Sequence, residues 1–500
     1  MKQEFDDIAL TKGQIVVIVV ANLAAMAALI LWGAETVRIF LTVITTLGFI
    51  SVAFSFVMLI VSLVNPTESE GDDTVTSPYP KITVLSPMAK EARVARRHVR
   101  SANRLIWPRG QIEFLPLIRE DDEETFQALH KDEENLPEAE RMKEGLPESF
   151  RVVRIPPSHY GTKPFALRWV LEDAPEAEKA KGEFFIILDA ENQPEPLLLA
   201  KMWQVMKKNP QLAAVQGVPV VSNWRFGFWQ RMQGAEYASH YRLFNPALIR
   251  LGLLTPLPGN SVLFRTQAVH EVGGYEPYNK AEDAALSVAL YQAGWEVASV
   301  DAYTKEEAPT NWRDWMRQRR RWLDGFLQTF FFNLRNPVRT FRNLGWANSG
   351  VFLLLFGIRP FIQLVNPLVF GLTILYIACL TPQVSALNPE LVAQTIDTLQ
   401  WVYSPTAKLM GMIMLFGGSV MFFYSLVIGC MHQKMWKSVP FMILEPVYRL
   451  FQSVAQVWAT IDYLTGAEWH LTPHENEEAT INAAPTFVQV AVTISAEGDD

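Results

Sequence analysis

Cysteine and excess positive charge are both scarce in this chain, and each absence excludes a class of protein. Only Cys379 and Cys430 occur among the 500 residues, and both lie in apolar segments, which excludes a disulfide framework and a cysteine-based zinc site. The formal net charge is −8 at pH 7, whereas a nucleic-acid-binding domain usually presents a basic face. We therefore expect no nucleic acid partner.

Long hydrophobic runs, in contrast, are present from the start. Residues 14–32 and 39–64 are each long enough to cross a hydrocarbon core, which needs about 20 apolar residues. The second run follows the first almost at once, so we do not expect the first run to be a removable signal peptide. Charged residues crowd the segment 65–345, which we take as cytoplasmic. The sequence therefore predicts an integral inner (plasma) membrane protein.

Shifts in composition predict five parts of the chain. They are an N-terminal transmembrane hairpin at 1–66, a globular cytoplasmic domain at 67–322, an amphipathic interface region at 323–345, a C-terminal transmembrane bundle at 346–475 and an acidic flexible tail at 476–500. Residues 381–406 contain no Lys or Arg and are placed outside, whereas 431–437 are placed inside. The segment 346–359 is then interfacial or re-entrant, with breaks expected at Pro360 and Pro367.

Short apolar runs alternate with helix-like stretches in the globular domain. The runs are 81–86, 112–118, 150–155 and 184–189, and an Arg-rich amphipathic segment spans 90–104. This alternation predicts an α/β domain with a mainly parallel sheet covered by helices.

Ligands of open α/β sheets bind beyond the carboxyl ends of the strands, so the residues after each run are candidate site residues. They are Pro87 and Glu91 after the first run, Glu120 and Asp122 after the second, and Asp189 and Glu191 after the run 184–189. Carboxylates at alternate positions can aim at one cation, and Mg²⁺ or Mn²⁺ prefers such oxygen ligands. Asp189 and Glu191 are therefore the predicted metal ligands.

A second constellation lies just before the later apolar runs. Glu282 and Asp283 are followed 35 residues later by Gln318, and then by Arg321 and Trp322. A carboxylate can accept a proton, while amide, guanidinium and aromatic groups suit phosphate and sugar. Together these residues predict glycosyl transfer beside a bilayer.

The ordered motifs resemble the membrane-integrated, processive branch of glycosyltransferase family 2, the cellulose synthase-like enzymes, over roughly residues 80–475. The motifs that carry the resemblance are Pro87 and Glu91, the acidic turn at 120–122, Thr162-Lys163-Pro164, the pair Asp189 and Glu191, Gly259-Asn260-Ser261, Gly273-Gly274-Tyr275, Glu282-Asp283, and Gln318 with Arg321-Trp322.

The resemblance implies a GT-A-like domain inserted between transmembrane helices, and inverting, metal-dependent transfer from a nucleotide sugar. It implies that Asp283 is the base, with Glu282 beside it. The implied donor contacts are Pro87, Glu91, Glu120, Asp122, Lys163, Asp189 and Arg321, and the implied acceptor contacts are Gly259, Asn260, Ser261, Gln318 and Trp322.

The same resemblance implies a product and partners. UDP-glucose is the expected donor, followed by UDP-N-acetylglucosamine, and the acceptor is the end of a growing β-linked polysaccharide. We expect export through the protein's own membrane bundle, contact with the lipid bilayer, and room for an envelope export subunit.

Other interpretations stay open. One is transfer of a single sugar to a lipid acceptor. Another is an inactive membrane scaffold, motivated by Glu191 and Glu120 at positions where the family commonly has Asp. Locally, the pair Glu282-Asp283 could begin a helix, and the segment 317–321 could be a basic anchor at the membrane.

Overall fold

The structure, a computed structural model, describes residues 34–64, 77–130, 149–386, 388–400, 409 and 419–466. The first predicted span at 14–32, the charged segment 131–148 and the tail 476–500 lie outside the described residues. The same holds for much of the apolar run 407–430.

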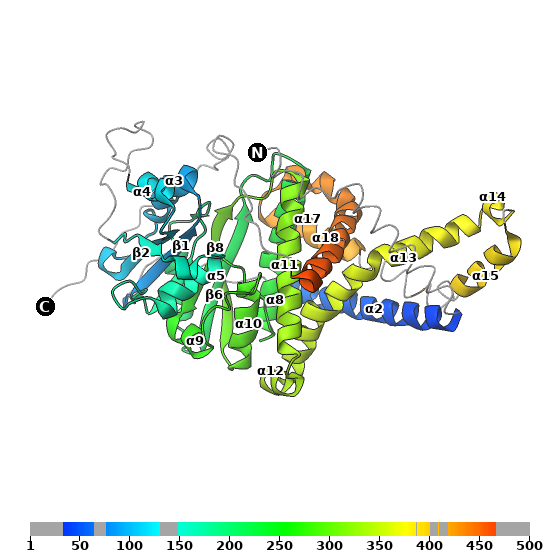
Figure 1. The fold of residues 1–500 in the computed structure, drawn as a ribbon, viewed down its shortest axis with the longest axis horizontal. Coiled ribbons are helices and arrows are strands. Elements are labelled where there is room, and N and C mark those ends of the chain that lie inside the picture. Colours follow the sequence, from blue (N-terminus) through cyan, green and yellow to red (C-terminus); the bar gives the residue numbers. More distant parts are fainter. Residues whose placement is uncertain are drawn as a thin grey trace.

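A mixed sheet forms the centre of the globular part (Figure 1). Its strands are β1 (Ile82–Met88), β2 (Ile112–Arg119), β3 (Val153–Ile155), β4 (Phe184–Ile187), β5 (Gln193–Pro194), β6 (Leu212–Val221), β7 (Val262–Arg265) and β8 (Glu296–Glu306). Their order is β3-β2-β1-β4-β7-β6-β8-β5. Strands β7 and β5 run against their neighbours, and the other pairings are parallel. The four predicted strands are confirmed. The sheet, predicted to be mainly parallel, is mixed, with four parallel and three antiparallel pairings among the described strands.

The sheet buries both of its faces. In β4, Phe184 and Ile186 pack with α6 (Leu198–Met206), whereas Phe185 and Ile187 pack on the opposite side with α8 (Asn245–Arg250) and α10 (Glu282–Gln292). Successive side chains of a strand point to opposite faces, so a strand covered on both sides reads as an unbroken apolar run. This explains why these strands are visible in the sequence.

Further helices surround the sheet and extend away from it. Those of the globular part are α3 (Ala92–Ala102), α4 (Glu123–His130), α5 (Lys163–Arg168), α7 (Phe228–Ser239) and α9 (Thr266–Glu271). Those towards the two chain ends are α2 (Ala34–Val64), α11 (Trp312–Asn333), α12 (Pro337–Phe352), α13 (Arg359–Cys379), α14 (Pro382–Ser385), α15 (Pro389–Gln400), α17 (Ser419–His432) and α18 (Glu445–Thr465).

Helix α11 connects the globular part to the later helices (Figure 1). The side chain of Asn311 caps it by accepting hydrogen bonds from the backbone N–H groups of Arg313 and Asp314, each at 3.0 Å. The predicted domain border between residues 322 and 323 falls inside this helix. The Gln318–Trp322 motif therefore shares one helix with the first part of the predicted interface region, residues 323–333.

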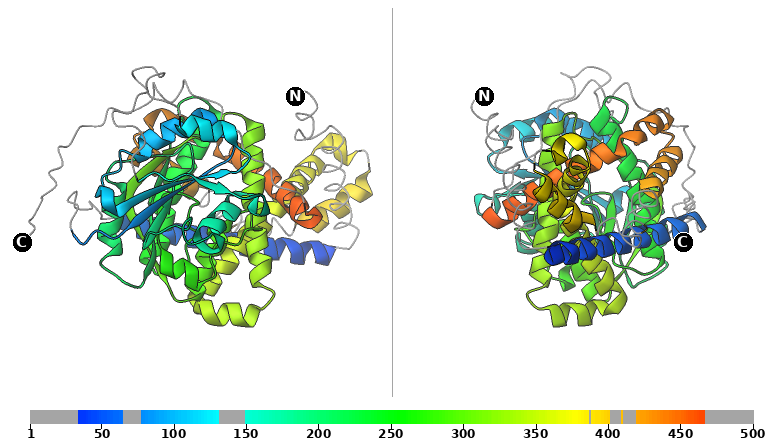
Figure 2. Two further views of the ribbon diagram at one scale, coloured as in Figure 1. Left: turned by 60° about the vertical axis from the view of Figure 1, so that its left-hand side comes forward. Right: turned by 90° about the vertical axis from the view of Figure 1, so that its right-hand side faces the viewer.

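Two helical segments of the described chain are long and apolar enough to cross a bilayer, Ile39–Val64 and Pro337–Cys379. Only 17% of the most apolar window of the first and 6% of that of the second are buried, so they do not resemble core helices of a soluble protein. Helices α2 and α13 project together away from the sheet (Figure 1 and the left view of Figure 2). Leu372 packs against Val37 and Leu41 between them.

The break in this second segment lies at Gly345, not at the prolines. Gly345 has φ +73°, a conformation that residues with a Cβ rarely adopt. Pro360 instead lies in the first turn of α13, where a missing N–H costs little, and Pro367 is accommodated inside the helix. The chain from 346 to 359 is helical throughout.

We predict that Gly325→Ala moves α11 away from the start of α10. A Cβ at Gly325 would lie 2.2 Å from the backbone N and 2.5 Å from the Cβ of Ala281, and backbone cannot yield cheaply. We expect a loss of about 1–3 kcal/mol in the free energy of unfolding, as for other overpacked sites, measured by thermal unfolding in detergent. Gly350→Ala in α12 is the control, since nothing lies within 4 Å of its added Cβ. Equal stability of the two variants would contradict the prediction.

Candidate active site

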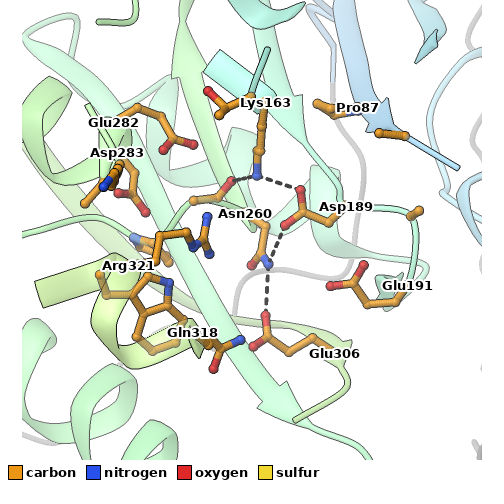
Figure 3. A pocket seen from close by; sticks show the side chains of 18 of the residues that line it. Pro87, Lys163, Asp189, Glu191, Asn260, Glu282, Asp283, Glu306, Gln318 and Arg321 are labelled. Atoms are coloured by element: carbon orange, nitrogen blue, oxygen red, sulfur yellow. Dashed lines mark hydrogen bonds and ion pairs between the residues drawn. The ribbon is translucent and has the colours of Figure 1, made fainter. Parts of the chain in front are cut away.

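One cavity of about 860 Å³ opens at the carboxyl end of the sheet and contains most of the predicted site residues. The predicted residues on its wall are Pro87, Glu91, Lys163, Asp189, Glu191, Gly259, Asn260, Glu282, Asp283, Gln318, Arg321 and Trp322. They come from the ends of β1 and β4, the starts of α5 and α10, the approach to β7, and α11. Asp189, Asp283 and Arg321 thus share one cavity although they are distant in sequence (Figure 3).

Lys163 is the cation between the two acidic groups of the cavity. Its Nζ donates to Oδ1 of Asp189 at 2.6 Å and to the carbonyl oxygen of Gly259 at 2.8 Å. Burial acts to lower the pKa of Lys163, but the charges of Asp189, Glu282 and Asp283 outweigh burial and raise the pKa. Lys163 therefore stays protonated and offsets the repulsion among these carboxylates.

Glu282 and Asp283 occupy the first turn of α10, as the helix-start interpretation predicted, and they also face the cavity. Oδ1 of Asp283 accepts a hydrogen bond from the backbone N–H of Ala284 at 2.8 Å. Burial raises the pKa of Asp283, opposed by that N–H, Lys163 and Arg321. Burial and the neighbouring Asp283 likewise raise the pKa of Glu282. The pKa values of both carboxyls therefore lie nearer to neutral pH than those of exposed acids, which suits a proton acceptor.

Gly259 has no side chain, which leaves open the space between Asp283 and Lys163. A Cβ at this position would lie 3.0 Å from Oδ2 of Asp283 and 3.6 Å from Nζ of Lys163. Any larger residue would stand between the carboxylate and the ammonium group.

Asp189 and Glu191 were predicted to hold a divalent cation. Within the described residues, no group of three or more His, Cys, Asp or Glu side chains is placed to hold a metal ion. Two carboxylates on one cavity wall nevertheless fit an ion that takes its remaining ligands from phosphate and water. Both oxygens of Asp189 already accept hydrogen bonds, from Lys163 at 2.6 Å and from Nδ2 of Asn260 at 3.3 Å, so its carboxylate plane is fixed.

Three predicted contacts, Glu120, Asp122 and Ser261, are not on the cavity wall. Oδ2 of Asp122 instead accepts from the backbone N–H of Lys90 at 2.7 Å and so shapes the loop after β1. The hydroxyl of Ser261 donates to Oδ1 of Asn260 at 3.2 Å and so helps to hold the side chain of Asn260 in place.

The side chain of Glu120 is exposed, and Arg119 and Glu124 line the cavity on this side. The guanidinium of Arg119 lies 4.1 Å from the ring centroid of Tyr160 and pairs with Asp121. Around the predicted acidic turn, Arg119 and Glu124 therefore line the cavity, and Glu120 and Asp122 do not.

A buried polar cluster fixes α11, and no pattern in the sequence predicted it. Arg319 donates to both oxygens of Glu236 on α7, at 2.7 and 2.6 Å. The hydroxyl of Tyr448 on α18 donates to the same carboxylate at 2.7 Å, and Nε1 of Trp315 donates to that hydroxyl at 3.0 Å. These hydrogen bonds set the position of Gln318, Arg321 and Trp322, since all three residues belong to α11.

Glu306 is a further cavity residue that the sequence reading missed. It ends β8, and Nδ2 of Asn260 donates to its Oε2 at 2.9 Å (Figure 3). Burial raises the pKa of Glu306 to about 7, with Glu191 and Asp189 adding to the shift and Asn260 opposing it. The rule that selected Asp189, a carboxylate at the end of a strand, would also have found Glu306 if β8 had been recognised.

Comparison with known proteins agrees with this geometry. A family model described as "Glycosyl transferase family group 2" matches residues 184–414. "Glucomannan 4-beta-mannosyltransferase 2" of Arabidopsis thaliana is 24% identical over 321 residues, covering 63% of this chain and 57% of the relative. "Probable glycosyltransferase YdaM" of Bacillus subtilis (strain 168) is 22% identical over 260 residues, covering 50% of this chain and 58% of the relative. The chain spans little more than half the length of these relatives.

A solved structure shows the same fold. The "Mannosyltransferase PcManGT from Pyrobaculum calidifontis in complex with GDP-Man and Mn2+" superposes with a TM-score of 0.52 at 15% identity, covering 87% of this chain and 100% of that one. The predicted GT-A-like architecture of the globular domain is thereby confirmed.

We predict that Glu236→Gln loosens α11, because Arg319 is nearly buried and would lose its charged partner. The expected loss is about 2–4 kcal/mol in the free energy of unfolding, measured by thermal unfolding in detergent. Glu123→Gln is the control, since Glu123 pairs with Arg154 at the exposed surface, where ion pairs contribute little. A Glu236 variant as stable as the control would show that the cluster does not hold the helix.

Proposed function

We propose that the chain transfers a hexosyl group from a nucleotide sugar to the end of a growing β-linked glycan, with inversion at the anomeric carbon, and the match of residues 184–414 to the glycosyltransferase family 2 model supports this. The observation that carries this proposal is the convergence of Asp283, Lys163 and Arg321 with Asp189 in one cavity. An inverting transfer needs a base on one side of the anomeric carbon and cationic groups at the leaving diphosphate on the other.

In the proposed mechanism, Asp283 in its deprotonated form accepts the proton of an acceptor hydroxyl. The hydroxyl oxygen forms the new bond to the anomeric carbon as the bond from that carbon to the diphosphate oxygen breaks. The electron pair leaves with the nucleoside diphosphate, and Lys163 and Arg321 stabilise its charge. The start of α10 places its positive dipole end beside Asp283, where it favours the ionised form of that carboxyl.

Asp189 and Glu191 are the residues proposed to hold a divalent cation, Mg²⁺ or Mn²⁺. When bound, such an ion supplies Lewis-acid neutralisation of diphosphate oxygens. The hydrogen bond from Lys163 orients the carboxylate of Asp189 towards this position.

The acceptor sugar is proposed to lie against α11. Trp322 offers an apolar face to a pyranose ring, and the guanidinium of Arg319 lies 4.8 Å from its ring centroid. Gln318 is held by a hydrogen bond from Nε2 of Gln233 to its Oε1 at 3.1 Å, which leaves its own amide hydrogens for sugar hydroxyls.

We propose that α2 and α13 anchor the enzyme in a bilayer with the catalytic domain on the cytoplasmic side. The exposed apolar surfaces of both helices support this arrangement. Helix α18 packs on α11 and directs Tyr448 and Gln452 towards Glu236 on the cavity wall. Polar groups therefore continue from the active site into the helical part, as passage of a hydrophilic polymer to the far side requires.

Two features bear on the donor. The resemblance of the motifs favours UDP-glucose, whereas the Arabidopsis thaliana relative is named for mannose transfer and the solved structure contains GDP-Man. Both donors, and UDP-N-acetylglucosamine, belong in the test. Transfer of one sugar to a lipid is the second candidate function, because the cavity lies beside the apolar helices.

Incubation of the purified full-length protein with labelled nucleotide sugars and Mn²⁺ is the first test. We expect release of nucleoside diphosphate and a long, glycosidase-sensitive product from one donor. Asp283→Asn removes the base and should lower turnover about a hundredfold or more, whereas Asp301→Asn, which alters an exposed acid outside the cavity, should not. A single-sugar lipid product would reject processivity. Turnover unaffected by Asp283→Asn would reject the assigned base, whereas the absence of turnover with every donor would favour the inactive scaffold.

The pH dependence of kcat/KM offers a second test. Asp283 must be ionised to accept the proton, and burial raises its pKa, so the rate should fall on acidification at a higher pH than an exposed aspartate, with a pKa of about 3.9, would give. Glu282→Gln removes a neighbouring negative charge, which favours the ionised form of Asp283 and should move this acid limb to lower pH. An acid limb at the same pH in both proteins would contradict the assignment.

A further inference from the structure

Glu306 takes part in a hydrogen-bonded series on the cavity wall. Nζ of Lys163 donates to Oδ1 of Asp189 at 2.6 Å, and Nδ2 of Asn260 donates to Oδ2 of the same residue at 3.3 Å. The same Nδ2 donates to Oε2 of Glu306 at 2.9 Å. The series joins α5, β4, the approach to β7 and the end of β8 (Figure 3).

The amide of Asn260 has only one orientation that suits all its neighbours. Its nitrogen donates to carboxylate oxygens of both Asp189 and Glu306. Its oxygen accepts from the hydroxyl of Ser261 at 3.2 Å. Reversal of the amide would place its oxygen against both carboxylates, so Glu306 fixes which end of Asn260 meets Asp189.

The burial of Glu306 points to a role. Its side chain is 8% exposed, and within the described part of the chain no Lys or Arg forms an ion pair with it. Glu191 and Asp189 face the same end of the cavity and repel it. A glutamate in this position costs folding free energy that an uncharged residue of the same size would not.

We propose that Glu306 is a positioning residue of the donor site: through the amide of Asn260 it holds Asp189 in the orientation that meets the donor diphosphate and its cation. This inference rests on the proposed function. In this role Glu306 neither contacts the sugar nor transfers a proton. Glu306 acts on Asp189 through the side chain of Asn260.

The experiment measures the binding of Mn²⁺ with UDP or GDP by calorimetry, together with the steady-state KM for the donor and kcat. Glu306→Gln should weaken Mn²⁺-nucleotide binding and raise the donor KM by about tenfold or more, as loss of a supporting residue of a metal ligand does, with a smaller change in kcat. Glu306→Asp, which keeps an ionised acceptor, should recover part of the loss. Glu296→Gln is the control, because this exposed glutamate lies at the opposite end of β8 and bonds only Asn209 at the surface.

A double-substitution cycle separates positioning from general damage. Asn260→Ala should weaken Mn²⁺-nucleotide binding as Glu306→Gln does, and the double variant should lose no more than either single variant, because both break the same path to Asp189. Fully additive losses would overturn the proposal. If Glu306→Gln does not fold, Glu306→Asp and Asn260→Ala still complete the comparison.

The proposal and the proposed function fail in different ways. If the wild-type protein transfers sugar but Glu306→Gln binds nucleotide and Mn²⁺ unchanged, the role of Glu306 is wrong and the transferase function stands. If the wild-type protein transfers no sugar from any donor, the proposed function fails. The binding cycle then decides the role of Glu306 by itself.

Discussion

Repulsion among carboxylates is the constraint on which this site depends. Asp189, Glu282 and Asp283 share one cavity. Like charges that are close together in a poorly solvated place repel one another and destabilise the folded state. Protonated Lys163 stands between them, bonded to Asp189 and to the Gly259 carbonyl. The same electrostatic balance that permits the acids to remain close also prepares the cavity for a cation and a diphosphate.

A second constraint is mechanical. Helix α11 carries Gln318, Arg321 and Trp322 on the cavity wall, and Glu236, Arg319 and Tyr448 bind it to α7 and α18. Close packing of Gly325 against Ala281 brings the same helix to the start of α10, where the acidic pair lies. The chemical groups and the apolar helices are thus parts of one packed unit. Movement of the helical part would shift the residues of the site, because packed cores transmit strain.

Four of the eight strands in the described chain could be predicted, because an apolar run marks a buried strand in the sequence. The strands near 82, 112 and 184 are buried on both faces and read as apolar runs. The reversal of β7 escaped prediction, since strand direction depends on the connections and not on composition. Strand β8 also escaped, because its alternating partly buried residues resemble a polar segment. Glu306 was missed for that reason alone.

The sequence by itself determined which residue types the site contains: Asp189 and Glu191 after a strand, Glu282 and Asp283 at a helix start, and Gln318 to Trp322 before the apolar helices. Tertiary structure alone decided which of these share a cavity, that Arg119 and Glu124 replace Glu120 and Asp122 on its wall, and that Glu306 joins them. The physical reason is that spacing along a chain fixes neighbours only within a helix or strand. Burial, charge balance and the direction of a side chain arise where separate elements meet.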